Sequence, residues 1–164
     1  MSVQDYLAHL QHESNLRNIP SFIYLFVLGI MGLIGNSLIL IVYSRKKKET
    51  ATVVFIKSIA VVDLITNVLI IPATTYVNLN TWNFPLPSLC KAYIYLNIVT
   101  AVTPAINILA IAVTRYRKIC HPFGWQVSTR QARAVTITVA IFSCLLCVPY
   151  TVVHGQQTIP TPNP

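Results

Sequence analysis

The sequence predicts an all-α protein, a bundle of four transmembrane helices, and three observations support that prediction. Of the 164 residues, 54% are hydrophobic and only 10% are charged, whereas ordinary soluble domains carry about 25% charged residues. Four apolar runs each reach the roughly 20 residues that a bilayer-spanning helix needs. These runs lack the alternation of barrel strands, so the helix is the spanning structure that fits them.

The first two expected helices cover residues 19–44 and 52–77. A polar N-terminal tail over residues 1–18 precedes them. The second helix contains Asp63, the only carboxylate within any expected span. An ionisable group at the bilayer centre costs roughly 2.5–3.5 kcal/mol on insertion scales, so Asp63 is a candidate functional residue.

The third and fourth expected helices cover residues 90–113 and 132–153. Pro104 lies inside the third and is expected to kink it, because proline removes a backbone hydrogen bond. Residues 19–153 therefore form one transmembrane domain. The segment 154–164 is polar, rich in proline and too short to cross a bilayer.

The basic residues predict the orientation of the bundle. Only Arg17 and Lys91 lie at one side, and the other ten of the twelve Lys and Arg residues lie at the opposite side. Cytoplasmic loops carry the Lys and Arg excess, so we expect an extracellular N-terminus and cytoplasmic contact with anionic membrane lipid. Lys57, just inside the second run, is expected to extend back toward this side. Basic residues divided among four apolar helices do not suit nucleic acid, which we exclude as a partner.

Polar side chains follow one face of three expected helices. Asn67 lies one helical turn after Asp63, the first helix places Asn36 beside small residues, and the third carries Asn97 and Thr100. One interpretation is an intramembrane polar network of Asn36, Asp63 and Asn67. The alternative is ordinary hydrogen bonding between packed helices, worth about 0.6 kcal/mol each, and for the asparagines both interpretations stay open.

Six short motifs follow one another along the chain. They are Gly35-Asn36-Ser37-Leu38, Ser58-Ile59-Ala60-Val61-Val62-Asp63-Leu64, Trp82-Asn83-Phe84, Cys90, Thr114-Arg115-Tyr116 and Pro149. Arg115 lies 25 residues after Cys90. In order and spacing these motifs resemble those of the rhodopsin-like, or class A, G-protein-coupled receptors, and the resemblance covers residues 20–155.

The resemblance implies a plasma-membrane receptor that transduces an extracellular ligand to a heterotrimeric G protein. It implies that Arg115, with Thr114 and Tyr116, lies at the cytoplasmic end of the third helix and serves coupling and activation. The family has Asp-Arg-Tyr at these positions, so Thr114 replaces an acid that would pair with the arginine. We therefore expect a resting state that is less well locked.

The expected ligand is a peptide rather than an amine. Similar receptors for cationic amines have a carboxylate where this chain has Asn97, and no carboxylate lies in the outer half of any expected span. Part of the pocket is expected from Thr74, Tyr76, Trp82, Tyr93, Tyr95, Asn97 and Thr100.

The resemblance also implies seven helices, and a disulfide between Cys90 and the second extracellular loop. The chain has four expected spans, and residues 154–164, the start of that loop, contain no cysteine. We therefore expect an unpaired Cys90 and interpret the chain as a fragment, a truncated isoform or an incomplete gene model.

Two other functions are compatible with four spans. One is a truncated, non-signalling protein that associates with full-length receptors. The other is a subunit of a channel or transporter, which would show a continuous polar pore face or matched broken helices. The chain has no Gly-x-Ser-x-Gly, phosphate-loop or His-Glu-x-x-His motif. We expect no enzymatic activity, no cofactor and no metal.

Overall fold

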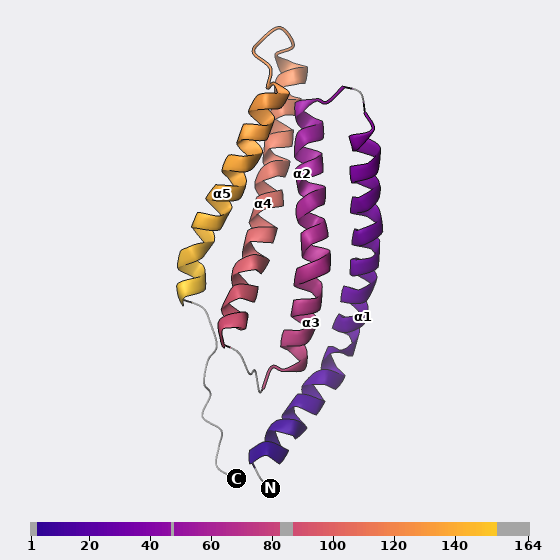
Figure 1. Cartoon of the computed structure of the whole chain (residues 1–164), viewed down its shortest axis with the longest axis vertical. Coiled ribbons are helices and arrows are strands. Elements are labelled where there is room, and N and C mark those ends of the chain that lie inside the picture. The colour runs from indigo at the N-terminus through magenta and orange to yellow at the C-terminus, as the bar shows by residue number, and fades with distance from the viewer. Residues whose placement is uncertain (1–2, 47, 83–86, 154–164) are drawn as a thin grey trace.

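The structure is a bundle of long helices. The computed structural model describes residues 3–46, 48–82 and 87–153. The elements are α1 (Val3–Ser44), α2 (Ala51–Ile65), the π-helical turn η1 (Thr66–Ile70), α3 (Ile71–Leu79), α4 (Pro87–Cys120) and α5 (Thr129–Val153). Figure 1 shows them side by side: α2, η1 and α3 form one rod between α1 and α4, and α5 packs against α4.

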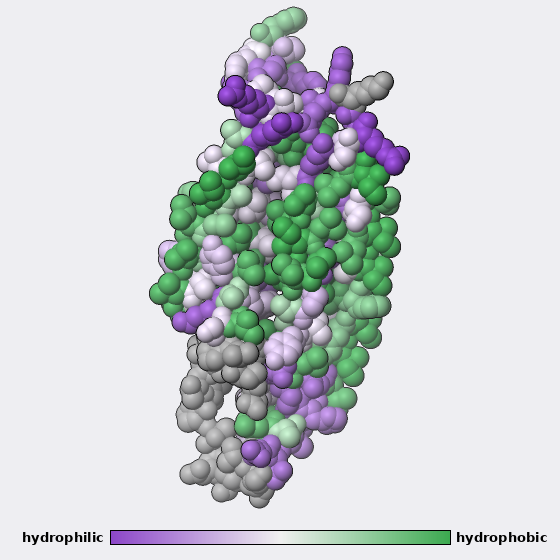
Figure 2. Space-filling model, in the orientation of Figure 1, coloured by the Kyte–Doolittle hydropathy of each residue, from purple (hydrophilic) through white to green (hydrophobic). Residues whose placement is uncertain are grey.

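Four helical stretches are long and apolar enough to cross a membrane. They are Gln4–Ser44, Ala51–Leu79, Ser88–Cys120 and Thr129–Val153. Their outward side chains are mostly apolar, and Figure 2 shows hydrophobic surface over the middle of the bundle with hydrophilic residues toward its ends. The predicted fold class, an all-α bundle with four spans in this chain, is confirmed.

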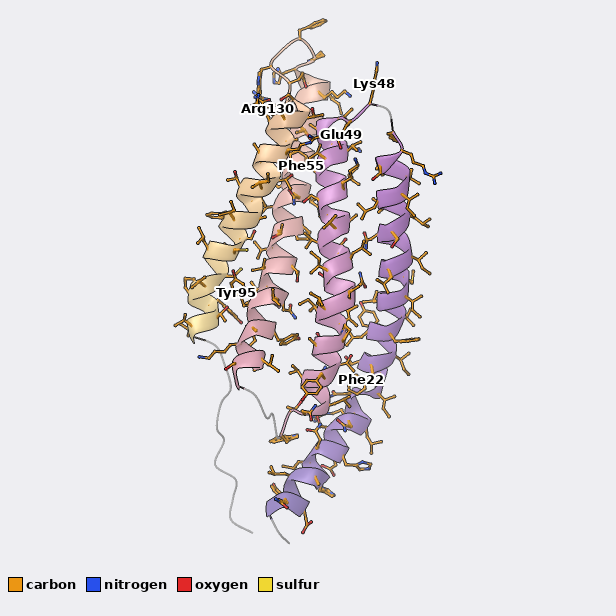
Figure 3. The ribbon with its side chains drawn as sticks, in the orientation of Figure 1. Phe22, Lys48, Glu49, Phe55, Tyr95 and Arg130 are labelled. Atoms are coloured by element: carbon orange, nitrogen blue, oxygen red, sulfur yellow. The ribbon has the colours of Figure 1, made fainter. Side chains whose placement is uncertain are left out.

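A small apolar core holds three helices together near one end. Val54 and Phe55 of α2 pack with Ala132 of α5, and Phe55 is only 1% exposed. Ala110 and Ile111 of α4 pack against this cluster. Figure 3 shows Phe55 at the end of the bundle that carries Glu49 and Arg130. This core fixes α2, α4 and α5 relative to one another where the basic residues gather.

Helix α1 begins at Val3, whereas the expected span begins at residue 19, so the helix extends beyond the apolar run into the N-terminal segment. Residues 3–18 contain several strong helix formers, including Leu, Ala, Gln, Glu and Arg, and these propagate the helix beyond the apolar run. Pro20 lies inside the helix, where it removes one backbone hydrogen bond. The part before it runs obliquely toward the end of α3 (Figure 1).

The second span contains the π-helical turn η1 at its middle. Pro72 stands at the beginning of α3, directly after η1. Proline has no N–H group, and its ring crowds the carbonyl four residues earlier. A single wider turn relieves that conflict without ending the helix, and such turns are frequent at functional sites.

Helix α5 begins at a capping box that the sequence contains. The Ser128 hydroxyl accepts a hydrogen bond from the Gln131 backbone N–H at 3.3 Å, and the Ser128 N–H donates to Gln131 Oε1 at 3.0 Å. These bonds satisfy donors that a helix otherwise leaves open at its N-terminus. The helix therefore begins at Thr129, slightly before the expected residue 132.

Candidate functional site

The end of the bundle formed by the loops 45–50 and 121–128 carries most of the positive charge, and we call it the basic end. The opposite end, which contains the N-terminus, is the N-terminal end. The described Lys and Arg residues of the basic end are Arg45, Lys46, Lys48, Lys57, Arg115, Arg117, Lys118, Arg130 and Arg133. Figure 2 shows hydrophilic side chains gathered there, and Figure 3 labels Lys48 and Arg130 among them.

Arg115 lies in the last turns of α4 at the basic end, and its side chain is exposed. Thr114 is half-buried, and its hydroxyl donates to the Ile111 carbonyl at 2.8 Å, within its own helix. Among residues 3–46, 48–82 and 87–153, Arg115 forms no ion pair. The guanidinium is thus presented at the surface without a carboxylate that restrains it.

Aromatic contacts order the chain beyond Arg115. The Tyr116 ring meets the His121 ring edge to face, with 6.0 Å between ring centroids. The Arg117 guanidinium lies 4.9 Å from the centroid of the Trp125 ring, a cation–π contact. The loop 121–128 therefore folds back against the end of α4, where His121 and Trp125 contact the two residues that follow Arg115.

Among the described residues, the side chains of the predicted intramembrane network, Asn36, Asp63 and Asn67, form no hydrogen bond with one another. Asn36 Nδ2 donates to the Gly32 carbonyl at 3.0 Å, and Asn67 Nδ2 donates to the Asp63 carbonyl at 2.7 Å. Each amide thus bonds within its own helix. The half-buried Asp63 carboxylate accepts no hydrogen bond from the part of the chain that the structure describes.

Three of the expected pocket residues meet between α3 and α4 near the N-terminal end. The Tyr93 hydroxyl lies 3.0 Å from Thr74 Oγ1 and accepts a hydrogen bond from Asn97 Nδ2 at 3.2 Å. All three side chains are half-buried. The chain of hydrogen bonds joins α3 to α4 and lines the space between them with groups that donate and accept.

The other expected pocket residues lie apart from this group. Thr100 bonds the carbonyls of Leu96 and Asn97 in its own helix. Tyr76 is 47% exposed. Tyr95, labelled in Figure 3, donates its hydroxyl to the Cys144 carbonyl at 3.1 Å and so joins α4 to α5.

Trp82 lies at the end of the described residues before the α3–α4 connection and is 38% exposed. The rest of the Trp82-Asn83-Phe84 motif falls outside the described residues, as does the segment 154–164. The four cysteines, Cys90, Cys120, Cys144 and Cys147, are all free among the described residues. Cys147 is buried in α5, consistent with a packing role.

The chain thus has an exposed arginine at one end and a hydrogen-bonded polar group between helices at the other. A sequence model of the family described as "7 transmembrane receptor (rhodopsin family)" matches residues 35–163. The chain belongs to this rhodopsin family of seven-transmembrane receptors. The match includes Gly35-Asn36, Asp63, Arg115 and Pro149, so the resemblance inferred from those motifs is confirmed.

Three curated relatives of this chain carry the name gastrin/cholecystokinin type B receptor. The gastrin/cholecystokinin type B receptors of Rattus norvegicus and Mus musculus are each 37% identical over 138 residues, which is 81% of this chain and 30% of theirs. The receptor of the same name from Canis lupus familiaris is 37% identical over 136 residues. The chain spans about 30% of the length of the relatives it matches.

Sequence reasoning missed Glu49, which organises the basic end of this rhodopsin-family chain. Glu49 Oε1 accepts a hydrogen bond from Lys57 Nζ at 2.8 Å, and Glu49 Oε2 accepts one from Arg133 of α5. Lys57 thus extends toward the basic end, as expected, but to a carboxylate of the same chain. The available signal was that Glu49 is the only acid of the chain at that end.

We expect Glu49→Gln to lower the thermal unfolding midpoint of this chain in lipid nanodiscs at neutral pH. The hydrogen bonds and charges of Lys57 and Arg133 hold the Glu49 pKa below its ordinary value of 4.5. A lowered folded-state pKa stabilises the fold above the unfolded-state pKa and loses that effect as pH falls through the folded value. The gap between wild type and variant should therefore close below about pH 4.5. Glu13→Gln, in an exposed pair with His9, is the control; a gap that persists at low pH would contradict the ion-pair account.

Another residue outside the predicted site set is Asn107 in α4, which lies on the polar face of the third span and is 0% exposed. Its Nδ2 donates to Ser58 Oγ of α2 at 3.3 Å. Its Oδ1 has no hydrogen-bond partner within the described residues. An amide buried in the middle of a span joins two helices through the polar contact that lipid cannot replace.

Gly32→Ala is expected to destabilise the chain by about 1–2 kcal/mol, a usual cost of overpacking. A Cβ added at Gly32 would lie 2.5 Å from the Asn67 side-chain amide, which is held by its bond to the Asp63 carbonyl. Gly35→Ala is the matched control, because an added Cβ there meets nothing within 4 Å. Denaturant titration in mixed micelles would measure the free energy of unfolding of both variants. An equal decrease in both would mean that Gly32 of α1 does not pack closely against Asn67 of η1.

Proposed function

We propose that this chain is the ligand-binding and G-protein-facing part of a receptor for a peptide, with its N-terminus extracellular and its basic end cytoplasmic. The observation that carries the proposal is the separation of two sites along one helix, α4. Tyr93 and Asn97, near the N-terminal end of α4, meet α3, and Arg115 stands exposed near its other end. Family membership supports coupling to a heterotrimeric G protein at the plasma membrane.

The ligand end supports a peptide over an amine. The cluster of Thr74, Tyr93 and Asn97 is neutral, and it offers hydroxyl and amide groups of the kind that pair with a peptide main chain. A cationic amine would need a carboxylate to neutralise its charge, and none of these three side chains supplies one. The relatives named gastrin/cholecystokinin receptors agree with this assignment.

A chimera tests the ligand class. Residues 1–153 of this chain would replace the matching part of the rat gastrin/cholecystokinin type B receptor, with cell-surface expression measured first. We expect saturable binding from a panel of labelled neuropeptides and none from a panel of labelled biogenic amines. Amine binding that Asn97→Ala removes would contradict the peptide assignment.

The orientation has its own test. An epitope tag placed before Met1 should bind antibody on intact cells, and a tag placed in the loop 121–128 only after permeabilisation. The positive-inside rule predicts this result from the Lys and Arg residues of the basic end. The reverse pattern would assign Arg115 to the outside and exclude G-protein coupling through it.

A further inference from the structure

The N-terminal segment of α1, residues 3–18, forms a part of the bundle that the family match does not include. The match begins at residue 35, whereas α1 begins at Val3. At 1.5 Å per residue, a helix of 42 residues is about twice as long as the roughly 30 Å hydrocarbon core. Figure 1 shows that the extra length crosses toward the end of α3 instead of continuing straight.

Gln11 fastens this segment to the end of α3. Its Nε2 donates to the Asn78 carbonyl at 3.2 Å, and its Oε1 accepts from the Trp82 backbone N–H at 3.1 Å. The same Nε2 lies 2.7 Å from Asn15 Oδ1, which orients the amide. One side chain thus satisfies a carbonyl and an N–H group of the backbone at the C-terminal end of α3 and just beyond it, where helices leave such groups open.

The segment presents one face to the bundle. Leu7, Gln11, Ser14 and Asn18 follow one another at helical spacing and are buried or half-buried, with Ser14 only 8% exposed. His9, His12 and Glu13 point away and are exposed. This pattern distinguishes a docked segment from a solvated tail.

A cavity of about 330 Å³ lies between this segment and the end of α3. Its apolar walls are Leu7 and Ala8 on one side and Leu79 and Trp82 on the other. The remaining lining side chains are the amides of Gln4, Gln11 and Asn80, so none of the described lining residues carries a charge. The volume is at the lower limit of ligand pockets, so it suits one side chain with its adjacent backbone and not an entire peptide.

We propose that this cavity is a subsite for one uncharged apolar side chain of the peptide ligand, and that Gln11 is the positioning residue that holds its outer wall. The proposal rests on the peptide function proposed above. The neutral lining decides the class of the occupant, because a charged side chain would lose its hydration here without gaining an opposite charge. Gln4 lines the cavity and is exposed, so its amide can bond the main chain that carries the apolar group.

The test uses the chain itself and a minimal probe, so it does not depend on a known ligand or on G-protein coupling. Trp82 lies in the cavity wall and Trp125 at the basic end, and these are the only two tryptophans. With Trp125→Phe as background, Trp82 alone reports the cavity in lipid nanodiscs. We expect N-acetylphenylalanine amide to reduce acrylamide quenching of Trp82 about twofold at saturation, as an aromatic ring covers the indole. N-acetyllysine amide and N-acetylglycine amide should give no protection.

Three variants distinguish binding of the probe in the cavity from non-specific binding of the probe to the helices. Gln11→Leu keeps the side-chain volume but removes both hydrogen bonds to the end of α3. It should lower the affinity for the phenylalanine probe about tenfold, because the cavity wall is no longer preorganised. His12→Leu, on the exposed face of the same turn, should leave binding unchanged. Ala8→Phe fills the cavity without touching the Gln11 bonds and should abolish protection. Circular dichroism checks that each variant retains its helix content.

Two results would overturn the proposal. One is equal protection of Trp82 by the phenylalanine, lysine and glycine probes. The other is undiminished protection in Ala8→Phe, because then the probe lies elsewhere. Absence of a peptide response in the chimera, with the probe results intact, would count against the peptide function and leave the apolar subsite standing.

Discussion

Thr114→Asp is expected to lower basal G-protein activation by the chimera about fivefold, because an ion pair worth about 1 kcal/mol in the resting state shifts its population by that factor. In the present chain Arg115 is exposed and has no ion pair among the described residues, and the Thr114 hydroxyl is bonded to the Ile111 carbonyl. An aspartate beside Arg115 would supply the missing partner. Basal nucleotide exchange in membranes without added ligand measures the change.

The matched control for this prediction is Thr114→Asn. It has nearly the shape of aspartate without the charge, so it should leave basal activity close to that of the unaltered chimera. Doubling the salt concentration should weaken the effect of aspartate, since exposed charges are screened. An unchanged basal rate in Thr114→Asp, at equal surface expression, would show that the resting state is not held at this position.

Tyr93→Phe should weaken peptide binding to the chimera about tenfold, since an unpaired polar group in a partly buried site costs about 1 kcal/mol or more. The Tyr93 hydroxyl joins Thr74 of α3 to Asn97 of α4, at 3.0 and 3.2 Å. Its removal leaves the Asn97 amide without that acceptor and loosens the two walls of the ligand end. Saturation binding of the labelled peptide identified from the panel measures the loss.

Tyr95→Phe gives this measurement a close control. It removes the same hydroxyl two residues along α4, but Tyr95 bonds the Cys144 carbonyl of α5 instead of the Thr74 group. We expect a lower unfolding midpoint in Tyr95→Phe with nearly unchanged peptide affinity. Equal losses of affinity in both variants would mean that helix packing, and not the Tyr93 cluster, controls binding.

Prediction from sequence worked best where a single physical requirement, such as the apolar length that spans a bilayer, determines the structure. The four spans follow from apolar length, because the bilayer imposes a minimum that few soluble helices meet. The start of α5 was expected at residue 132 and lies at Thr129, because Ser128 and Gln131 form a capping box that the apolar run does not reveal. The beginning of α1 did not follow from apolar length, because residues 3–18 are too polar to extend the apolar run although they contain strong helix formers.

The sequence predicted which residues belong to the candidate ligand site better than it predicted which of them contact one another. Tyr93, Asn97 and Thr74 were expected to share a pocket and do meet. Tyr95 was expected with them, yet two residues turn a side chain to the other side of a helix, and it bonds α5. Glu49 escaped notice because its role depends on Arg133, which is 84 residues away in the chain.

The central claim is that ligand binding near the N-terminal end of this chain reaches a G protein through Arg115, and one measurement tests it most directly. Peptide-stimulated nucleotide exchange would be compared in the chimera and in its Arg115→Ala variant, at matched surface expression and with peptide affinity measured in parallel. We expect strong peptide-stimulated nucleotide exchange in the chimera and none in Arg115→Ala, with peptide binding retained in both. A variant that signals as strongly as the chimera would contradict the claim, and so would a chimera that binds peptide without activating a G protein.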